Sequence, residues 1–270
     1  MDINERGLVL LGCGKMGSAM LTGWLAQGVR PDAVWVVDPY PSDWLRDLAA
    51  QGLRLNVGLP ASPAIVLVAV KPQMMAEALP QLVALGNGDT LFLSVAAGTP
   101  ISYYEGVLGA DTPVIRAMPN TPAAVGRGIT AIIGNDRASD AHLRAAETLL
   151  GAVGQVVRLD DEGQMDAVTA VSGSGPAYVF HLIETLAAAG EAEGLPADLA
   201  MALAKATVGG AGQLAEDASD DPAQLRVNVT SPGGTTAAAL GVLMDADTGF
   251  PALLRRAVKA AADRSRELGQ

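Results

Sequence analysis

The chain has 270 residues, of which 50% are hydrophobic but only 4% aromatic, and its formal net charge is −11 at pH 7. This length allows two modest domains, with cores built from Ala, Val, Leu and Ile. The acidic excess, without any cluster of Lys or Arg, argues against a nucleic-acid partner or an anionic membrane, because both need a concentrated positive surface.

The N-terminal residues 1–6 lack the basic region that begins a secretory signal, and the apolar runs are far shorter than the roughly 20 residues that span a bilayer. The single cysteine, Cys13, excludes an internal disulfide and fits a reducing compartment. We therefore expect a cytoplasmic protein.

The first half of the chain alternates apolar runs with helical segments. Runs without polar alternation are typical of strands covered on both faces, and they occur at 8–11, 33–37, 65–70, 91–95 and 114–118. The segments between them predict crossover helices at 15–27, 42–51 and 74–85. This pattern predicts a Rossmann-type, doubly wound α/β sheet. We expect edge strands at 131–133 and 155–157, around a helix at 139–150.

Beyond about residue 160 the chain consists of successive Ala- and Leu-rich segments that predict helices. Gly175 and Pro176 start one helix, Gly194 and Pro196 separate it from the next, and the segment 220–222 opens another. The sequence thus predicts a dinucleotide-binding domain of residues 1–159 and an all-α domain of residues 160–270.

A G-x-G-x-x-G motif, Gly12 to Gly17, follows the first strand and opens a helix. In such a motif the first glycine makes the tight turn, the second admits a pyrophosphate, and the third lets helix and strand pack closely. Asp38 ends the second strand, 21 positions after Gly17, as expected for a residue that binds the cofactor ribose. The combination predicts an NAD(P)H site.

Asp38 bears on the choice of cofactor. A carboxylate accepts hydrogen bonds from both ribose hydroxyls of NADH and repels the 2′-phosphate of NADPH, and residues 39–42 supply no cation. The alternative is that Asp38 only caps the next helix. We favour NADH.

The usual catalytic constellations are missing from the sequence. We interpret Cys13 as a packing residue and His142 and His181 as helix-surface or packing residues, and no Cys, His or carboxylate array suggests a metal. Hydride transfer to a protonated C=N bond suits such a chain, since an iminium needs orientation and a hydrogen-bond donor more than a strong acid.

Two polar, glycine-rich segments stand out in the second half, at 171–178 and 229–236. The second segment precedes an Ala-rich helix, so its hydroxyls and backbone N–H groups suit a carboxylate ligand. Plain helix capping by Ser and Thr explains the same residues equally well.

Six ordered stretches resemble the pyrroline-5-carboxylate reductase family along nearly the whole chain: G-C-G-K-M-G at 12–17, A-V-K-P-Q at 69–73, S-V-A-A-G at 94–98, R-A-M-P-N-T-P-A at 116–123, V-S-G-S-G-P-A-Y at 171–178 and V-T-S-P-G-G-T-T at 229–236. The resemblance implies an enzyme that reduces 1-pyrroline-5-carboxylate to L-proline with NAD(P)H. It also implies a homodimer through the helical domain, often assembled into a ring of dimers.

The resemblance implies a role for each matching position. The pyrophosphate would be held by Gly12, Cys13, Gly14, Lys15, Met16 and Gly17, and the nicotinamide side lined by Ala69, Val70, Lys71, Pro72, Ala96 and Ala97. The substrate carboxylate would be bound by Ser231, Gly233, Gly234, Thr235 and Thr236, with the Thr236 hydroxyl as the catalytic donor to the ring nitrogen.

Three positions depart from the family pattern: Met244 replaces a polar residue, Asp221-Pro222 stands where many relatives have His-Pro, and Asp38 stands where NADP-using relatives carry small polar or basic residues. A β-hydroxyacid dehydrogenase is the competing enzyme class, but the first lysine after Gly175 is Lys205, too distant for the lysine that class needs. A nucleotide sensor without turnover would have no use for the 231–236 loop.

Overall fold

The computed structural model describes residues 2–269 and divides into two compact units. Of the described residues, the sheet unit comprises 2–173 and 262–269, and the helical unit 174–261. This division falls after Gly173 rather than after residue 159, because the segment from Glu162 onward packs with the sheet unit: Glu162 pairs with Arg116, and Met165 is buried. The chain end returns there as well, with Ser265 Oγ donating to Asp166 Oδ1 at 2.6 Å.

One eight-stranded sheet forms the centre of the sheet unit, in the order β3-β2-β1-β4-β5-β6-β7-β8. All neighbouring strands are parallel except β6 and β7. This order is the Rossmann-type, doubly wound topology, so that fold prediction is confirmed. The strands are β1 (Leu8–Leu11), β2 (Val34–Val37), β3 (Arg54–Leu55), β4 (Ile65–Val68), β5 (Leu91–Ser94), β6 (Val114–Met118), β7 (Gly128–Gly134) and β8 (Gly154–Arg158).

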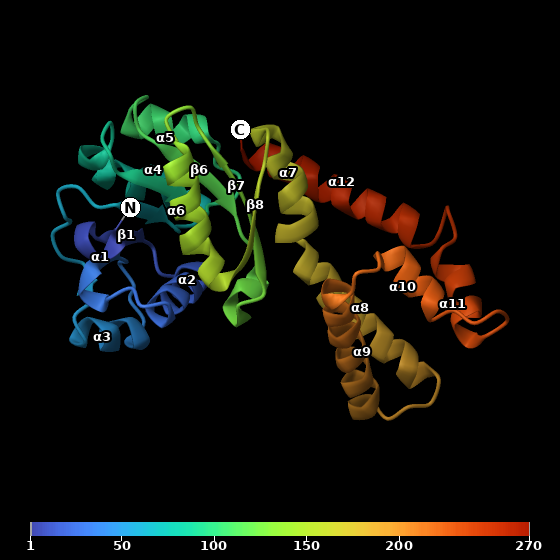
Figure 1. Ribbon diagram of the computed structural model, residues 1–270. Coiled ribbons are helices and arrows are strands. Elements are labelled where there is room, and N and C mark those ends of the chain that lie inside the picture. The colour runs from blue at the N-terminus through green and yellow to red at the C-terminus, as the bar shows by residue number, and fades with distance from the viewer. Residues whose placement is uncertain (1, 270) are drawn as a thin grey trace. The chain divides into compact units, whose positions relative to one another are not determined.

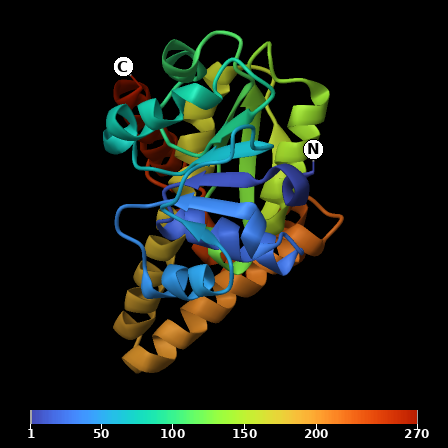
Figure 2. The same ribbon diagram turned by 90° about the vertical axis from the view of Figure 1, so that its left-hand side faces the viewer.

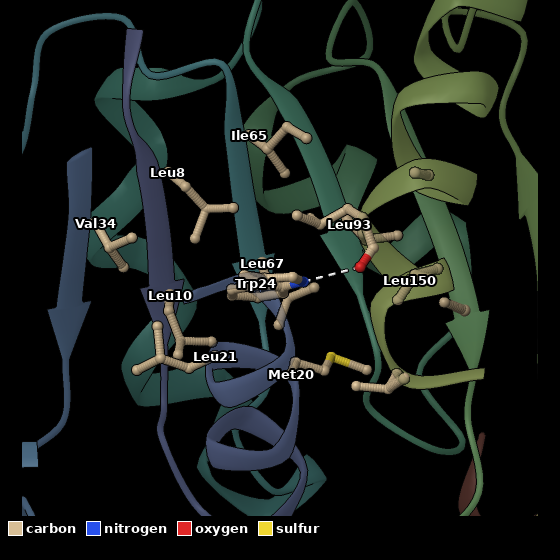
Figure 3. Close-up of a cluster of buried hydrophobic side chains, with 14 of the residues drawn as sticks. Leu8, Leu10, Met20, Leu21, Trp24, Val34, Ile65, Leu67, Leu93 and Leu150 are labelled. Atoms are coloured by element: carbon tan, nitrogen blue, oxygen red, sulfur yellow. Dashed lines mark hydrogen bonds between the residues drawn. The ribbon is translucent and has the colours of Figure 1, made fainter. Parts of the chain in front are cut away.

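Successive residues of the central strands are buried on opposite faces of the sheet, which is why these strands lack polar alternation. Leu8 and Leu10 of β1 face a cluster with helices α2, α3 and α6, whereas Val9 and Leu11 face one with α4, the 3-10 segment η3 and α5. The helices of both groups are labelled in Figure 1. In the first cluster Trp24 Nε1 donates to the carbonyl oxygen of Leu149 at 2.8 Å (Figure 3). The helices are α1 (Ile3–Arg6), α2 (Lys15–Ala26), α3 (Asp43–Ala50), α4 (Met75–Ala78), η3 (Leu79–Leu85), α5 (Ile101–Leu108) and α6 (Asp140–Leu150).

Two expectations about this unit were wrong. No continuous α-helix covers 74–85: α4 is flanked by 3-10 turns, Pro72–Met74 and Leu79–Leu85, because Pro80 lacks an N–H group and its ring clashes with the carbonyl four residues earlier. The segment 131–133 is not an edge strand, since β7 lies between β6 and β8. Further 3-10 turns occur at Pro31–Ala33, Thr121–Val125, Gly151–Val153 and Glu162–Gln164.

No strand follows β8 within residues 2–269, as expected. After α7 (Met165–Val168) and a π-helical turn, Thr169–Gly173, come α8 (Gly175–Ala192), α9 (Ala197–Asp217), α10 (Pro222–Asn228), α11 (Thr235–Leu243) and α12 (Phe250–Leu268). Helices α8 and α9 pack against each other through Ala187, Ala200 and Ala204. Figure 2 shows this helix pair from a second direction. None of the described helices is long and apolar enough to cross a membrane.

Candidate functional site

The glycine-rich loop joins β1 to α2, and two of its glycines are fixed by the backbone packing around them. Gly12 has φ +86°, and its N–H donates to the carbonyl oxygen of Val37 at 2.8 Å. A Cβ on Gly12 would lie 2.9 Å from Val70 Cγ1, and one on Gly17 would lie 2.6 Å from the Gly12 carbonyl oxygen. Side chains at either position would therefore push the strand, the turn and the helix apart.

The middle glycine of the loop faces open space. A Cβ on Gly14 would meet no atom within 4 Å, and Gly14 is the N-cap of α2 without any side-chain cap and without an acidic residue in the first helical turn. Helix N–H groups without a capping side chain, beside room for a ligand, form an anion site. This arrangement fits the pyrophosphate of a dinucleotide held by residues 12–17.

Asp38 follows β2 and contacts the same loop. Its Oδ2 accepts a hydrogen bond from the Cys13 N–H at 2.7 Å, and its Oδ1 accepts one from the Tyr40 N–H at 2.8 Å. The Asp38 main chain is held in turn by Asn56, whose amide accepts from the Asp38 N–H at 2.9 Å and donates to the Asp38 carbonyl at 2.8 Å. No sequence motif pointed to Asn56, a non-glycine residue with φ +51°.

The Cys13 thiol is not a nucleophile at neutral pH. Burial, and secondarily the nearby Asp38 carboxylate, raise its pKa to about 12. The side chain packs at the border of the core cluster on the α2 side of the sheet. These contacts support the interpretation of Cys13 as a packing residue of the loop.

The residues expected on the nicotinamide side follow strands β4 and β5. The Ala69 N–H donates to the Leu11 carbonyl at 2.8 Å, and the Val95 N–H donates to the Val68 carbonyl at 3.0 Å. The carboxyl ends of β1, β4 and β5 are therefore adjacent, which brings residues 69–70 and 96–97 to the edge of the sheet that carries the glycine loop. Lys71 and Pro72 are exposed just beyond this edge.

Two further motifs meet within the sheet unit in a way that the sequence did not reveal. Asn120 Nδ2 donates to Ser172 Oγ at 3.2 Å, and Asn120 Oδ1 accepts from the Ile129 N–H at 3.0 Å. This contact joins the segment 116–123 to 171–178, where residues 169–173 form a π-helical turn, a feature frequent at functional sites. The segment 116–123 is also connected to the chain after β8 by an ion pair between Arg116 and Glu162, at 2.7 Å, in which the arginine side chain is largely buried.

The residues expected to bind substrate form a turn between α10 and α11 in the helical unit. Gly233 has φ +70°, and the Gly234 N–H donates to the Ser231 carbonyl at 3.0 Å. Helix α11 begins at Thr235, with Gly234 as an N-cap that provides no side-chain hydrogen bond. The sequence left open whether the Ser and Thr side chains cap this helix or bind a ligand. The structure contains no such side-chain cap at the start of α11. The first N–H groups of α11 have no capping side chain, and Thr236 is half-buried beside them.

The two histidines have local structural contacts. His142 completes a capping box with Ser139 at the start of α6, and burial lowers the pKa of its imidazole. His181 contacts Glu184 one helical turn away on an exposed face of α8. Within residues 2–269 no three His, Cys, Asp or Glu side chains are grouped so that they could hold a metal ion.

The fold and the glycine loop define an NAD(P)H-dependent oxidoreductase. Residues 8–98 match the family model described as NADP oxidoreductase, coenzyme F420-dependent, and residues 162–268 match the one described as pyrroline-5-carboxylate reductase dimerisation. The second match begins close to the domain boundary expected at residue 160.

Full-length relatives identify the family. The chain is 39% identical to pyrroline-5-carboxylate reductase of Pseudomonas aeruginosa, over 97% of both chains, and 40% identical to that of Synechocystis, over 97% of this chain and 98% of the relative. It is similar to the solved structure of a pyrroline-5-carboxylate reductase from Coxiella burnetii, with 32% identity, a TM-score of 0.91 and coverage of 98% and 99%. The chain belongs to the pyrroline-5-carboxylate reductase family.

Proposed function

We propose that this chain carries out the reaction of its family, the NAD(P)H-dependent reduction of 1-pyrroline-5-carboxylate to L-proline, with its two anion-binding helix ends holding cofactor and substrate. In this reaction a hydride adds to the carbon of the protonated C=N bond, and the π electron pair moves to nitrogen, giving a secondary amine. The observation that carries the proposal is the start of α11, where N–H groups without a side-chain cap adjoin Ser231, Thr235 and Thr236.

The substrate carboxylate is bound by the turn of residues 231–236. The helix dipole favours a negative charge at the start of α11, which has no acidic residue in its first turn. Ser231 and Thr235 supply hydroxyls, and Gly233 and Gly234 let the backbone approach the ligand. The Thr236 hydroxyl donates to the ring nitrogen as its lone pair develops during hydride transfer, which is stabilisation specific to the transition state.

The cofactor is bound by the sheet unit, with its pyrophosphate on residues 12–17 and its nicotinamide against Ala69, Val70, Lys71, Pro72, Ala96 and Ala97. NADH is favoured over NADPH because the Asp38 carboxylate, held by two N–H groups, faces the ribose. Two cations follow β2 closely in the sequence. Arg46 pairs with Asp43 at 2.6 Å, and Arg54 stacks on Trp35 with Cζ 4.8 Å from the ring centroid and donates to the Asp32 carbonyl. A relative from Plasmodium falciparum, 27% identical with a TM-score of 0.84 and full coverage of both chains, was solved with NADP bound.

The active assembly is a homodimer, which can associate further into a ring of dimers, in a cytoplasmic setting that keeps Cys13 reduced. The helical unit buries little of its own apolar surface: its buried cluster consists of three alanines, while Phe180, Leu214 and Val242 are 58%, 56% and 72% exposed. Such a surface suits contact with a second copy. Light scattering at micromolar concentration is expected to give at least twice the 27.5 kDa chain mass, and a monomer would contradict the assignment.

The experiment that tests the reaction measures NADH and NADPH oxidation by the purified chain on addition of 1-pyrroline-5-carboxylate. Steady oxidation with formation of proline is expected. A folded sample that binds NADH but gives no turnover with this imine would refute the proposal and favour a nucleotide sensor. If NADH were oxidised only with a different imine, the assignment of 1-pyrroline-5-carboxylate as substrate would be wrong, whereas the assignment of imine reduction would stand.

A further inference from the structure

The turn between β5 and α5, residues 95–99, is connected by hydrogen bonds to Tyr104, a residue that takes no part in the proposed reaction. Tyr104 lies on α5 and is fully buried in the cluster on the α4 and α5 side of the sheet. The turn above it includes Ala96 and Ala97, which line the nicotinamide side in the function proposed above. The inference therefore rests on that cofactor placement.

A chain of hydrogen bonds leads from the Tyr104 hydroxyl to the backbone of the turn. The Tyr104 Oη and Ser94 Oγ atoms are 2.5 Å apart, and Ser94 Oγ accepts a hydrogen bond from the Ala96 N–H at 3.2 Å. The start of the turn is thus connected to a buried phenol.

These hydroxyls are enclosed by protein. Ser94 is 1% exposed and Tyr104 0% exposed, and no described buried side-chain N or O atom lacks a hydrogen-bond partner. Burial raises the pKa of Tyr104, so the phenol stays neutral throughout the physiological range and keeps its proton for the network. Because removal of one partner in such a network leaves the others unsatisfied, the network resists displacement of the turn.

The outer side of the turn is also occupied. Gly98 has φ +70°, and a Cβ there would lie 3.2 Å from Leu268 Cβ in the last turn of α12. The turn consequently has protein on both sides, the Tyr104 network beneath and the end of α12 outside. Packing and hydrogen bonds within the protein therefore define the conformation of the turn without a bound ligand.

We propose that Tyr104 is a positioning residue for the nicotinamide half of the cofactor, acting through Ser94 on the Ala96 backbone. The phenol touches neither cofactor nor substrate; it fixes the turn against which the nicotinamide ring lies. The adenosine and pyrophosphate half, held by the glycine loop and Asp38, does not depend on it.

The test compares Tyr104→Phe with Tyr103→Phe by calorimetric titration with NADH and with ADP-ribose, which lacks the nicotinamide ring. Tyr103 is the matched control, because it sits on the same helix, is half-buried, and its ring packs edge-on against Tyr104 at 5.9 Å. The Tyr103 hydroxyl makes no hydrogen bond within residues 2–269. The parent protein is expected to bind NADH more tightly than ADP-ribose.

Loss of one net hydrogen bond predicts a Kd for NADH raised about five- to tenfold in Tyr104→Phe, with the Kd for ADP-ribose unchanged within about twofold. Tyr103→Phe should change neither. Equal weakening of both ligands in Tyr104→Phe, or no weakening of either, would overturn the proposal. Ser94→Ala gives a second route if Tyr104→Phe is poorly folded, with the same selective loss expected. Because no imine is added, the result is independent of whether the chain reduces 1-pyrroline-5-carboxylate.

Discussion

Replacing Asp38 should alter the choice between NADH and NADPH more than it alters the overall rate. In the structure both carboxylate oxygens of Asp38 accept backbone N–H groups, from Cys13 at 2.7 Å and Tyr40 at 2.8 Å, so the carboxylate cannot swing away from a 2′-phosphate without breaking them. We expect the parent protein to prefer NADH. The neutral variants Asp38→Ser and Asp38→Asn should lose most of that preference.

The size of the effect follows from Coulomb's law. Two unit charges about 4 Å apart repel each other by roughly 1 kcal/mol in water and by about 4 kcal/mol at an effective dielectric constant near 20. Asp38 is half-buried at the rim of the sheet and its charge is partly compensated by two N–H donors, so the lower part of this range applies. A difference of about 1–2 kcal/mol corresponds to a preference of roughly five- to thirtyfold in kcat/KM.

The assay determines kcat/KM for both cofactors in the parent, in the two Asp38 variants and in Arg54→Ala. The ratio of the two constants is the informative quantity, because the Asp38 variants also lose an acceptor for the loop and should bind either cofactor less well. Arg54→Ala should leave the ratio unchanged, since Arg54 is engaged with Trp35 and Asp32. A parent that prefers NADPH, or an unchanged ratio in both Asp38 variants, would refute the reasoning.

Three further predictions concern the loop and the catalytic donor. Thr236→Val should lower kcat by roughly ten- to a thousandfold, about 1.4–4 kcal/mol, whereas Thr236→Ser should retain much of the rate; equal losses would show that the hydroxyl is not what matters. Gly17→Ala should lower the free energy of unfolding in urea by about 1–3 kcal/mol, because its Cβ would meet the Gly12 carbonyl, whereas Gly14→Ala should leave stability intact and raise the KM for NADH. Alkylation of Cys13 by iodoacetamide should rise about tenfold per pH unit between pH 7 and 9, because the pKa near 12 leaves the thiolate scarce; a plateau in that range would contradict the burial of the thiol.

Much of the sheet unit could be predicted because its signals are local. An apolar run such as 65–68 has to be buried on both faces, and the glycines at 12 and 17 report close backbone approaches that no other residue permits. Short or weakly patterned elements carry no such signal. Strand β3 has only two residues, and α5 begins after Pro100, whose side chain cannot cap it; the acceptor for its first N–H group is the distant Glu162, at 2.9 Å, so neither element was recognised.

The candidate site divides in the same way. The loop of residues 12–17 and the turn of residues 231–236 are continuous in sequence, so their chemistry can be inferred from the order of their residues. By contrast, Asn56 contacts Asp38 from 18 positions away in the sequence, and Asn120 contacts Ser172 from 52 positions away. Such pairs become visible only when the sheet and the segment after β8 are folded.

Some helices of the chain start with a capping side chain and others do not. Helices α3, α6 and α10 begin after Ser42, Ser139 and Asp221, whose side chains accept a hydrogen bond from the first turn. Helices α2 and α11 begin after Gly14 and Gly234, with no side-chain cap. Helices α5, α8 and α9 also lack an N-cap side-chain bond, but they start after Pro100, Ser174 and Pro196 rather than after a glycine. A helix start without a cap retains N–H donors and the positive end of the helix dipole. In a chain of net charge −11, whose overall field opposes anions, these two glycine-started helices provide the local positive potential that a pyrophosphate and a carboxylate need.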